Sequence, residues 1–322
     1  MMKTGILILN YNNATDTINC IHSIQQFNTA EIKIIIVDNA STNNEVVNEL
    51  FNFIREEYLT ESIIVNEGDM ISHTLPLITL FLSKDNGGYA QGNNKGLELF
   101  YKDDEIDNVL ILNNDVLFVE DIIPKLDLRL NELNDIAILS PLLYKKDLVA
   151  IDYNCARTNV GILDLILTYF LLSVRINPYT SSKHLILIEH PELLQNELVE
   201  IQLPSGSCMM FKKRLFQKIG GFDPHTFLYY EENILHRKIE KMGLKNFLCT
   251  DIKCIHLGAS TTSKISYNYT YYNRTNNSAL YYAKEYLHAN VMEFLFLKAM
   301  MKLYLCRKHI EHIIKSFFYY KF

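Results

Sequence analysis

The sequence predicts an α/β protein built on a mostly parallel sheet, with a helical extension at its C-terminal end. Three observations support this fold class. Apolar, β-branched runs alternate with amphipathic stretches between residues 5 and 130, as in successive strand–helix units. Four of these runs end in polar clusters, as buried strands do where they meet loops. After Tyr267 the apolar residues recur at helical spacing to the end of the chain.

The first half of the chain predicts four strands, each followed by a helix. The strands are expected at residues 5–9, 32–37, 78–82 and 109–112, and the helices at 15–26, 45–57, 90–101 and 120–130. Thr15 or Asp16 is the expected cap of the first helix. Residues 58–75 are interpreted as an insertion or a short extra strand. Ligands of open α/β sheets bind at the carboxyl ends of the strands, so the site is expected there.

The second half is less regular. Residues 144–200 show no clean periodicity and suit either a binding surface or a plain structural insertion. Residues 160–174 are very apolar, but Asp164 interrupts them and they fall short of the ~20 residues that span a bilayer. We interpret them as a buried or interfacial helix. A strand is expected at 199–203, and helices are expected at 213–219 and 231–242.

Composition excludes several classes of protein. Hydrophobic residues make up 48% and charged residues 21%, so the chain is globular. The net charge of -6 and the absence of a basic stripe argue against nucleic acid as a partner. The six cysteines show no CxxC pair, so we expect free thiols in a reducing compartment rather than a zinc site or disulfides. The first apolar run stops at Asn10 without a cleavage-site pattern, so it is a strand, and the expected location is cytoplasmic.

Two motifs at the strand ends suit a nucleotide ligand. Asp38 can accept hydrogen bonds from a nucleobase or ribose hydroxyl, although an aspartate there often caps the next helix. Residues 86–94 hold three glycines and three asparagines in a chain with only 12 glycines, and exposed amides at a helix start suit a diphosphate. A capped glycine turn would not explain the asparagines beyond it. The spacing is neither GxGxxG nor GxxxxGK[ST], which argues against dehydrogenases and P-loop kinases.

Three further segments carry acidic or imidazole side chains. Asp115 follows an apolar strand with no basic residue beside it, which suits Mg²⁺ or Mn²⁺ as well as a plain turn. Glu231 and Glu232 begin a helix behind an aromatic run, either as a catalytic pair or as partners of the helix dipole. His256 ends an apolar strand, where a lone histidine is usually structural. In combination with Asp115 it becomes a candidate metal or diphosphate ligand.

Taken in order, these segments resemble glycosyltransferase family 2, especially its rhamnosyltransferase-like members that build bacterial surface polysaccharides. The matching blocks are residues 6–12, 37–41, 86–94, 112–115, and 220–232 with His256 beyond. The resemblance implies a GT-A fold over residues 1–265, with a nucleotide-sugar-binding half at 1–115 and an acceptor half at 116–265. Residues 266–322 would then form a C-terminal helical extension.

The resemblance also implies an inverting, metal-dependent transfer from a nucleoside-diphosphate sugar to a polysaccharide or lipid-linked oligosaccharide. Asp115 and His256 would bind Mn²⁺ or Mg²⁺, and Glu232, with Glu231 beside it, would deprotonate the acceptor hydroxyl. The residues implied in donor binding are Asn10, Tyr11, Asp38, Asn86, Gly88, Asn94, Asn113, Asn114 and Asp115.

The chain departs from the family pattern at three positions that bear on the chemistry. Asn113 occupies the first position of the family's DXD element, so metal binding depends more heavily on Asp115. Glu232 stands where the family often has aspartate, and Ile234 stands where a further aspartate is common. A non-catalytic sugar-nucleotide or glycan-binding relative with the same fold is the alternative function.

The tail from residue 291 to 322 is a basic amphipathic helix by its pattern. Its basic residues Lys298, Lys302, Arg307, Lys308, Lys315 and Lys321 outnumber Glu293 and Glu311, and it ends in Phe317-Phe318-Tyr319-Tyr320. This pattern suits peripheral contact with an anionic membrane, at the inner face of the plasma membrane. A helix packed against the catalytic domain or a partner subunit would show the same apolar spacing.

Overall fold

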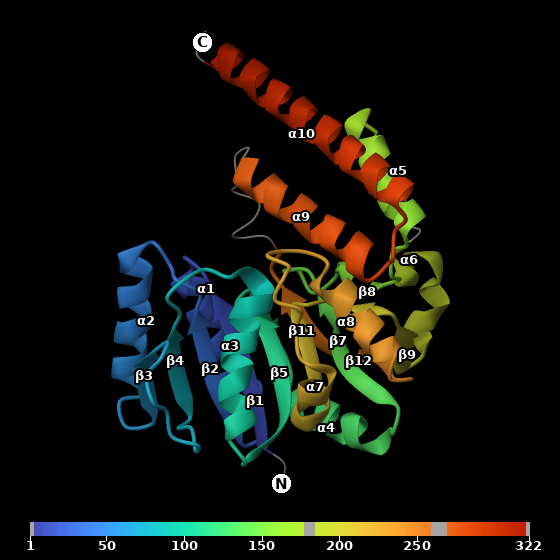
Figure 1. The fold of residues 1–322 in the computed structure, drawn as a ribbon. Helices are drawn as coiled ribbons and strands as arrows, with labels where there is room; N and C mark the ends of the chain where they lie inside the picture. Colours follow the sequence, from blue (N-terminus) through green and yellow to red (C-terminus); the bar gives the residue numbers. More distant parts are fainter. Residues whose placement is uncertain (1–2, 177–183, 259–268, 320–322) are drawn as a thin grey trace.

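The computed structural model describes residues 3–176, 184–258 and 269–319, with the side chains of the last segment described as far as Ile314. A central sheet has helices on both faces, and a separate layer of helices lies beyond the carboxyl ends of its parallel strands (Figure 1).

The central sheet is mixed, and its strand order is β3-β4-β2-β1-β5-β11-β7-β12-β6, with β9 paired to β12. Strands β3, β4, β2, β1 and β5 run parallel, whereas β11 runs antiparallel to β5. The strands of this sheet are β1 (Lys3–Asn10), β2 (Ile32–Asp38), β3 (Ser62–Asn66), β4 (Ile78–Leu82), β5 (Ile106–Asn113), β6 (Val116–Phe118), β7 (Ile136–Tyr144), β9 (Leu198–Ile201), β11 (Cys208–Lys212) and β12 (Lys245–His256). Two short strands, β8 (Ala156–Arg157) and β10 (Leu203–Pro204), pair separately.

Two hydrophobic cores cover the two faces of the sheet. Alternate residues of β1 divide between them, because Ile6 and Ile8 point into one core and Leu7 into the other. The first core is closed by α1 (Ala14–Phe27), α2 (Asn44–Glu57) and α4 (Ile123–Glu132). The second is closed by α3 (Gly88–Lys102), α7 (Lys213–Ile219) and α8 (Glu231–Glu240). A sheet buried on both faces explains why these strands read as continuous apolar runs.

The helical layer consists of α5 (Ile162–Ser173), α9 (Tyr269–Glu285) and α10 (Val291–Tyr319). It has its own core, in which Tyr282, Leu297 and Met301 are almost fully buried together with Leu165 and Tyr169 of α5. The layer is therefore not formed by the C-terminal segment alone, since α5 comes from the expected acceptor half. Within the described residues, no helix is both long enough and apolar enough to cross a bilayer.

Most elements of the first half were predicted to within two or three residues, and the block 58–75 contains the short extra strand β3. The cap of α1 is Asn13, whose side chain accepts from the backbone N–H of Asp16, rather than Thr15 or Asp16. The irregular region contains α5, the short α6 (Ile186–Glu189) and two 3-10 turns, Tyr153–Cys155 before α5 and Pro191–Gln195 after α6. All six cysteines are free, and five of them are buried.

Candidate active site

The parallel strands bring the first set of polar residues to one place. Asn10 is paired in register with Asp38 across β1 and β2, and Leu9 is paired with Asn113 across β1 and β5. The three strand ends therefore meet along one side of the sheet, as the βαβ pattern predicts.

Asn10 and Asp38 form a buried polar network rather than an open ligand surface. The side-chain amide of Asn10 donates to Asp38 Oδ2 at 2.8 Å, and its oxygen accepts from the Thr17 hydroxyl at 2.9 Å. Asp38 also accepts from the backbone N–H and hydroxyl of Ser41, so it caps the loop before α2. Asn114 joins through its amide, which donates to Thr17 Oγ1 at 3.1 Å. Tyr11, next to this network, is partly exposed.

The glycine- and asparagine-rich segment holds the start of α3 against other parts of the chain. Gly88 has φ +79°, and a Cβ there would lie 1.9 Å from the carbonyl oxygen of Phe227, so only glycine fits. Asn86 accepts from the Gly88 amide and from Asn39. Asn94 bonds both the N–H and the carbonyl of Phe222. Packing thus accounts for asparagines that a capped turn does not explain. Whether this segment also contacts a donor remains a prediction.

Asp115 and His256 lie together, as expected. His256 Nε2 is 3.5 Å from Asp115 Oδ1, and the other ring nitrogen, Nδ1, is 2.8 Å from Asp152 Oδ2. Burial disfavours the imidazolium, but hydrogen bonds and charges from the two aspartates outweigh it and raise the pKa of His256 to about 9. Asp152, in the loop after β7, was not anticipated from the sequence.

This group suits a divalent cation that completes its coordination with substrate and water. The chain offers one carboxylate and one imidazole nitrogen that face each other, and Asp152 binds the nitrogen that would not be a ligand. Within the described residues, no three His, Cys, Asp or Glu side chains form a closed metal cluster. An ion at Asp115 and His256 would have to displace the imidazolium proton.

The two adjacent glutamates lie in different environments. Glu231 is 3% exposed, and burial, together with the neighbouring charge of Glu232, raises its pKa to about 8. Its Oε1 has no hydrogen-bond partner within the described structure. Glu232 is more accessible, and its Oε1 accepts from the Gly206 backbone N–H at 3.1 Å and lies 3.7 Å from the Arg157 guanidinium. Near neutral pH Glu231 is therefore protonated, and Glu232 is the carboxylate available to a substrate.

A short loop connects Glu232 with the Asn113 end of β5. The carbonyl of Ser207 accepts from the Asn113 N–H at 2.8 Å, and the preceding residue, Gly206, donates to Glu232. A Cβ at Gly206 would lie 2.6 Å from Glu232 Oε1 and 3.1 Å from the Tyr89 hydroxyl. A side chain at this position would push the Glu232 carboxylate away from the Gly206 N–H.

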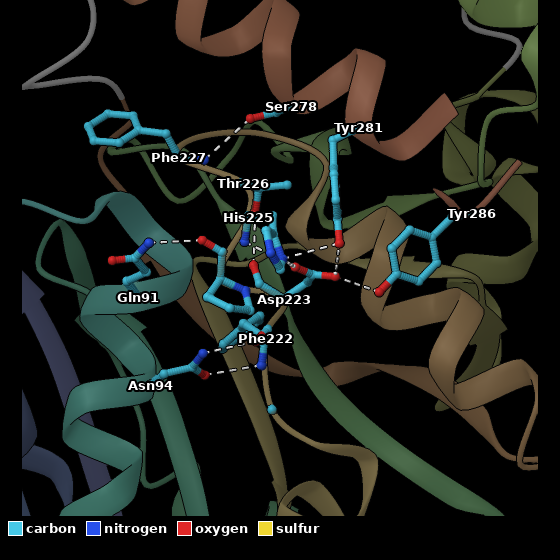
Figure 2. Close-up of polar contacts among 12 residues, drawn as sticks. Gln91, Asn94, Phe222, Asp223, His225, Thr226, Phe227, Ser278, Tyr281 and Tyr286 are labelled. Carbon is cyan, nitrogen blue, oxygen red and sulfur yellow. Dashed lines mark hydrogen bonds and ion pairs between the residues drawn. The ribbon is translucent and has the colours of Figure 1, made fainter. Parts of the chain in front are cut away.

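The loop that precedes the glutamates is held from two sides, as Figure 2 shows. On one side, Asn94 and Gln91 of α3 bond Phe222 and the Pro224 carbonyl. On the other, Tyr281 and Tyr286 donate to Asp223 Oδ2 at 3.0 and 2.6 Å.

Further contacts from α9 reach the end of this loop. The Ser278 hydroxyl accepts from the Phe227 N–H, and Arg274 lies 3.8 Å from the centre of the Phe227 ring. Tyr229 and Tyr230 have φ +69° and +71°, a strained conformation for residues other than glycine. Tyr230 stacks on Tyr282 of α9. The helical layer therefore helps to hold the backbone from which Glu231 and Glu232 project.

Sequence reasoning missed Asp152, Gly206 and Arg157. Asp152 and Arg157 belong to the region without periodicity, and their partners lie about a hundred residues away in His256 and 75 residues away in Glu232. No local signal identifies them. Gly206 follows the strand predicted at 199–203, and a glycine between two serines at that point was the available clue.

The chain is similar to known glycosyltransferases. No protein-family model matches it. A curated relative, the low-salt glycan biosynthesis hexosyltransferase Agl10 of Haloferax volcanii, is 25% identical over 244 residues, which make up 73% of this chain and 72% of that protein.

Two solved structures share the fold. The structure of GalNAc-T7 with UDP, GalNAc and Mn²⁺ matches 89% of this chain at 14% identity with a TM-score of 0.57, and this chain spans 50% of that one. The second is the mannosyltransferase PcManGT from Pyrobaculum calidifontis in complex with GDP-Man and Mn²⁺. The match covers 97% of this chain and 74% of the PcManGT chain, at 13% identity with a TM-score of 0.54. The fold is therefore the GT-A fold of glycosyltransferases, with helices added after the sheet.

Proposed function

We propose that this protein, a glycosyltransferase by its fold and its curated relative, transfers a sugar from a nucleoside-diphosphate donor to an acceptor hydroxyl with inversion, in the manner of glycosyltransferase family 2. The observation that carries the proposal is the placement of Glu232. Its carboxylate is held by the Gly206 amide in a loop whose next residue bonds Asn113, beside the proposed metal ligand Asp115. The proposed base is thus linked through Gly206 and Ser207 to the strand end that precedes the proposed metal ligand.

In the proposed reaction Glu232 is the general base. The acceptor oxygen forms a bond to the anomeric carbon while the bond from that carbon to the diphosphate breaks, and the acceptor proton passes to Glu232. Glu231 is buried and protonated near neutral pH, so it is unsuited to act as the base or as a nucleophile. One available carboxylate favours a single displacement with inversion over a two-step mechanism with a covalent intermediate.

Asp115 and His256 are the proposed ligands of Mn²⁺ or Mg²⁺. When bound, such an ion neutralises charge on the departing diphosphate. Asp152 is a positioning residue in this proposal, because its hydrogen bond to Nδ1 orients His256 with Nε2 towards Asp115. The structures of both solved relatives contain Mn²⁺ and a nucleotide or nucleotide sugar, which supports the same requirement here.

We propose that Asn10, Asp38 and Asn114 act on the donor indirectly, by supporting the loops that would contact its nucleoside. Their polar atoms bond one another, so they support the loops that carry Tyr11 and Ser41. Asn86, Gly88 and Asn94 are proposed to place the α3 start and the Phe227 loop at the sugar diphosphate. The proposed acceptor is a polysaccharide or lipid-linked oligosaccharide of the cell surface, in keeping with the relative named for glycan biosynthesis.

A donor panel tests the function. Nucleoside-diphosphate sugars with different bases and sugars are screened by thermal shift with and without Mn²⁺, and the best of them is then assayed for release of nucleoside diphosphate. A donor at ~100 times its dissociation constant stabilises the protein by ~2.7 kcal/mol, which is readily measured. Mn²⁺-dependent stabilisation with turnover supports the transferase. Stabilisation without turnover, with or without acceptors, would favour the non-catalytic sugar-nucleotide-binding relative.

A further inference from the structure

The helical layer exposes an unusual amount of apolar surface. Within the described residues, 23 large hydrophobic side chains are exposed. Of these, 13 lie on α5, on α10, or at Val174 and Ile176 directly after α5. Clusters of this kind on an otherwise polar surface mark sites of contact with another phase or molecule.

The exposed side of α10 carries an apolar row of its own, beside polar residues such as Lys298 and Lys302. The buried side packs Leu297, Met301 and Tyr304 into the core of the helical layer. The outward side carries a row at alternating spacings of four and three residues: Met292, Phe296, Ala299, Leu303, Cys306, Ile310 and Ile313, all of them exposed. A helix with apolar rows on two sides is normally covered on both, because apolar side chains stabilise a structure only when they are removed from water.

Helix α5 repeats the same pattern beside α10. Its inward residues Leu165 and Tyr169 share the core with α10, and Arg175 at its end is paired with Glu311 of α10 at 3.1 Å. Its outward row, Leu163, Leu167, Phe170 and Val174, has exposed fractions between 44% and 72%. Figure 1 shows α10 on the far side of α9 from the sheet, with α5 running up beside the end of α9 to cross α10. The exposed surface is therefore two helices wide.

Charge decides between the partners that this surface could take. Lys298 and Lys302 are exposed on α10. The two acids in the described part of α10 are both engaged, since Glu293 accepts from the Asn290 N–H and Glu311 pairs with Arg307 and Arg175. A two-fold contact between copies would bring these lysines near one another without an unengaged acid of α10 to oppose them. An anionic lipid surface opposes them directly and accepts the apolar rows.

We propose that α5 and α10 together form a membrane-docking surface that seats in the interface of an anionic bilayer. It extends the contact expected from the tail alone to a helix that the sequence placed in the acceptor half. The inference rests on the proposed function for its purpose, because a lipid-linked acceptor would reach the site at the same interface. Its physical basis is independent of that function.

Vesicle flotation of the full chain tests the surface. The protein is mixed with vesicles of phosphatidylcholine alone, or of phosphatidylcholine with phosphatidylglycerol, at low and high salt. We expect binding to the anionic vesicles that weakens with salt. Replacing Lys298 and Lys302 by glutamine should weaken it about fivefold for each lysine, since a basic residue near an anionic surface contributes about 1 kcal/mol.

Separate variants address each helix. Leu303→Gln with Ile310→Gln on α10, and Leu163→Gln with Leu167→Gln on α5, should each reduce binding at least ~10-fold through lost apolar burial. The matched control is Leu59→Gln with Leu128→Gln, two leucines that are 74% and 61% exposed on the sheet domain, and it should bind as the parent does. Unchanged far-ultraviolet circular dichroism and thermal midpoints check that each variant folds.

Four outcomes would overturn the proposal. The first is no binding to anionic vesicles by the parent protein, and the second is equal binding by the parent and the α10 variant. The third is a dimer in solution that the α5 and α10 variants dissociate, without any vesicle binding, which would assign the surface to a second copy. If only the α10 variant loses binding, the two-helix surface is wrong. Mn²⁺-dependent donor turnover by variants that do not bind vesicles would show that the proposed function stands even if the membrane-docking proposal fails.

Discussion

Replacing Glu232 by glutamine should remove the proposed base and leave almost everything else in place. Glutamine has nearly the same size, and its side-chain oxygen can still accept from the Gly206 N–H that bonds Glu232 at 3.1 Å. What is lost is the charge 3.7 Å from Arg157, in a pair whose side chains are 29% and 19% exposed. Ion pairs with this much contact with solvent contribute about 0–1 kcal/mol.

The expected effect on transfer is much larger. A positioned general base contributes ~10²–10⁴ in rate, or ~2.7–5.4 kcal/mol of barrier. Donor affinity should stay unchanged, because the proposed base contacts the acceptor. Calorimetry with the best donor of the panel and Mn²⁺ measures affinity, release of nucleoside diphosphate in the presence of acceptor measures rate, and urea denaturation measures stability.

Glu231→Gln is the matched control. Glu231 is protonated near neutral pH, so glutamine imitates the form already present, and transfer should fall by much less than in Glu232→Gln. The reasoning would be refuted by near-normal turnover of Glu232→Gln, or by equal losses in the two variants while both remain folded. A loss of donor affinity in Glu232→Gln would move Glu232 from the acceptor side to the donor side.

Four further outcomes are expected. Asp115→Ala should abolish Mn²⁺-dependent donor binding in calorimetry, and unchanged affinity would remove the metal assignment. Asp152→Asn should weaken Mn²⁺ binding ~10–100-fold, read by Mn²⁺ electron paramagnetic resonance, if Asp152 orients His256 as proposed. Because burial raises the folded-state pKa of Glu231 to about 8 from 4.5, the parent should lose stability as pH rises from about 5 to 8, and Glu231→Gln should lose less over the same range in urea denaturation. The raised pKa of His256 adds a loss above about pH 6.5 in both proteins. Gly88→Ala should lower the free energy of unfolding more than Gly220→Ala in the same measurement. Both glycines have positive φ, which strains alanine by about 1–2 kcal/mol, but only at Gly88 would the new Cβ lie 1.9 Å from a carbonyl oxygen, whereas Gly220 faces open space.

The parallel half of the fold could be predicted because its signals are local. In β1, β2 and β4 both faces are buried, so each reads as an unbroken apolar run that ends at a polar loop. Strands β6, β7 and β11 were missed. Phe118, Leu139 and Met210 are fully buried or nearly so, but their strands pair with partners far along the chain rather than in strand–helix order. The insertion of β11 between β5 and β7, antiparallel to β5, leaves no periodic signal in the sequence.

The candidate site shows the same division between local and distant signals. Asp115 and Glu232 were singled out because each stands at the boundary of an element and because the resemblance of the ordered segments to glycosyltransferase family 2 implies a role for each. Asp152 and Arg157 acquire their meaning only from His256 and Glu232, which reach them through the folded chain. Asn94 has a structural role that its motif did not indicate. Its place in a glycine-rich motif suggested a ligand, and in the structure both polar atoms of its side chain bond Phe222. Its contact with a donor stays a prediction.

The helical layer contacts the loop that carries the candidate base Glu232. The backbone at Tyr229 and Tyr230 is strained, and such strain persists only where surrounding contacts over-determine the conformation. Those contacts come from α9, through Tyr282 against Tyr230 and Tyr271 against Tyr229. Helix α9 in turn depends on α10, because Tyr282 is buried in a core that Leu297 and Met301 complete. A truncation that removes α10 would therefore expose this core and loosen the loop before Glu232. Loss of membrane binding in such a truncation would not separate docking from folding, whereas substitutions on the outward rows leave the core residues untouched.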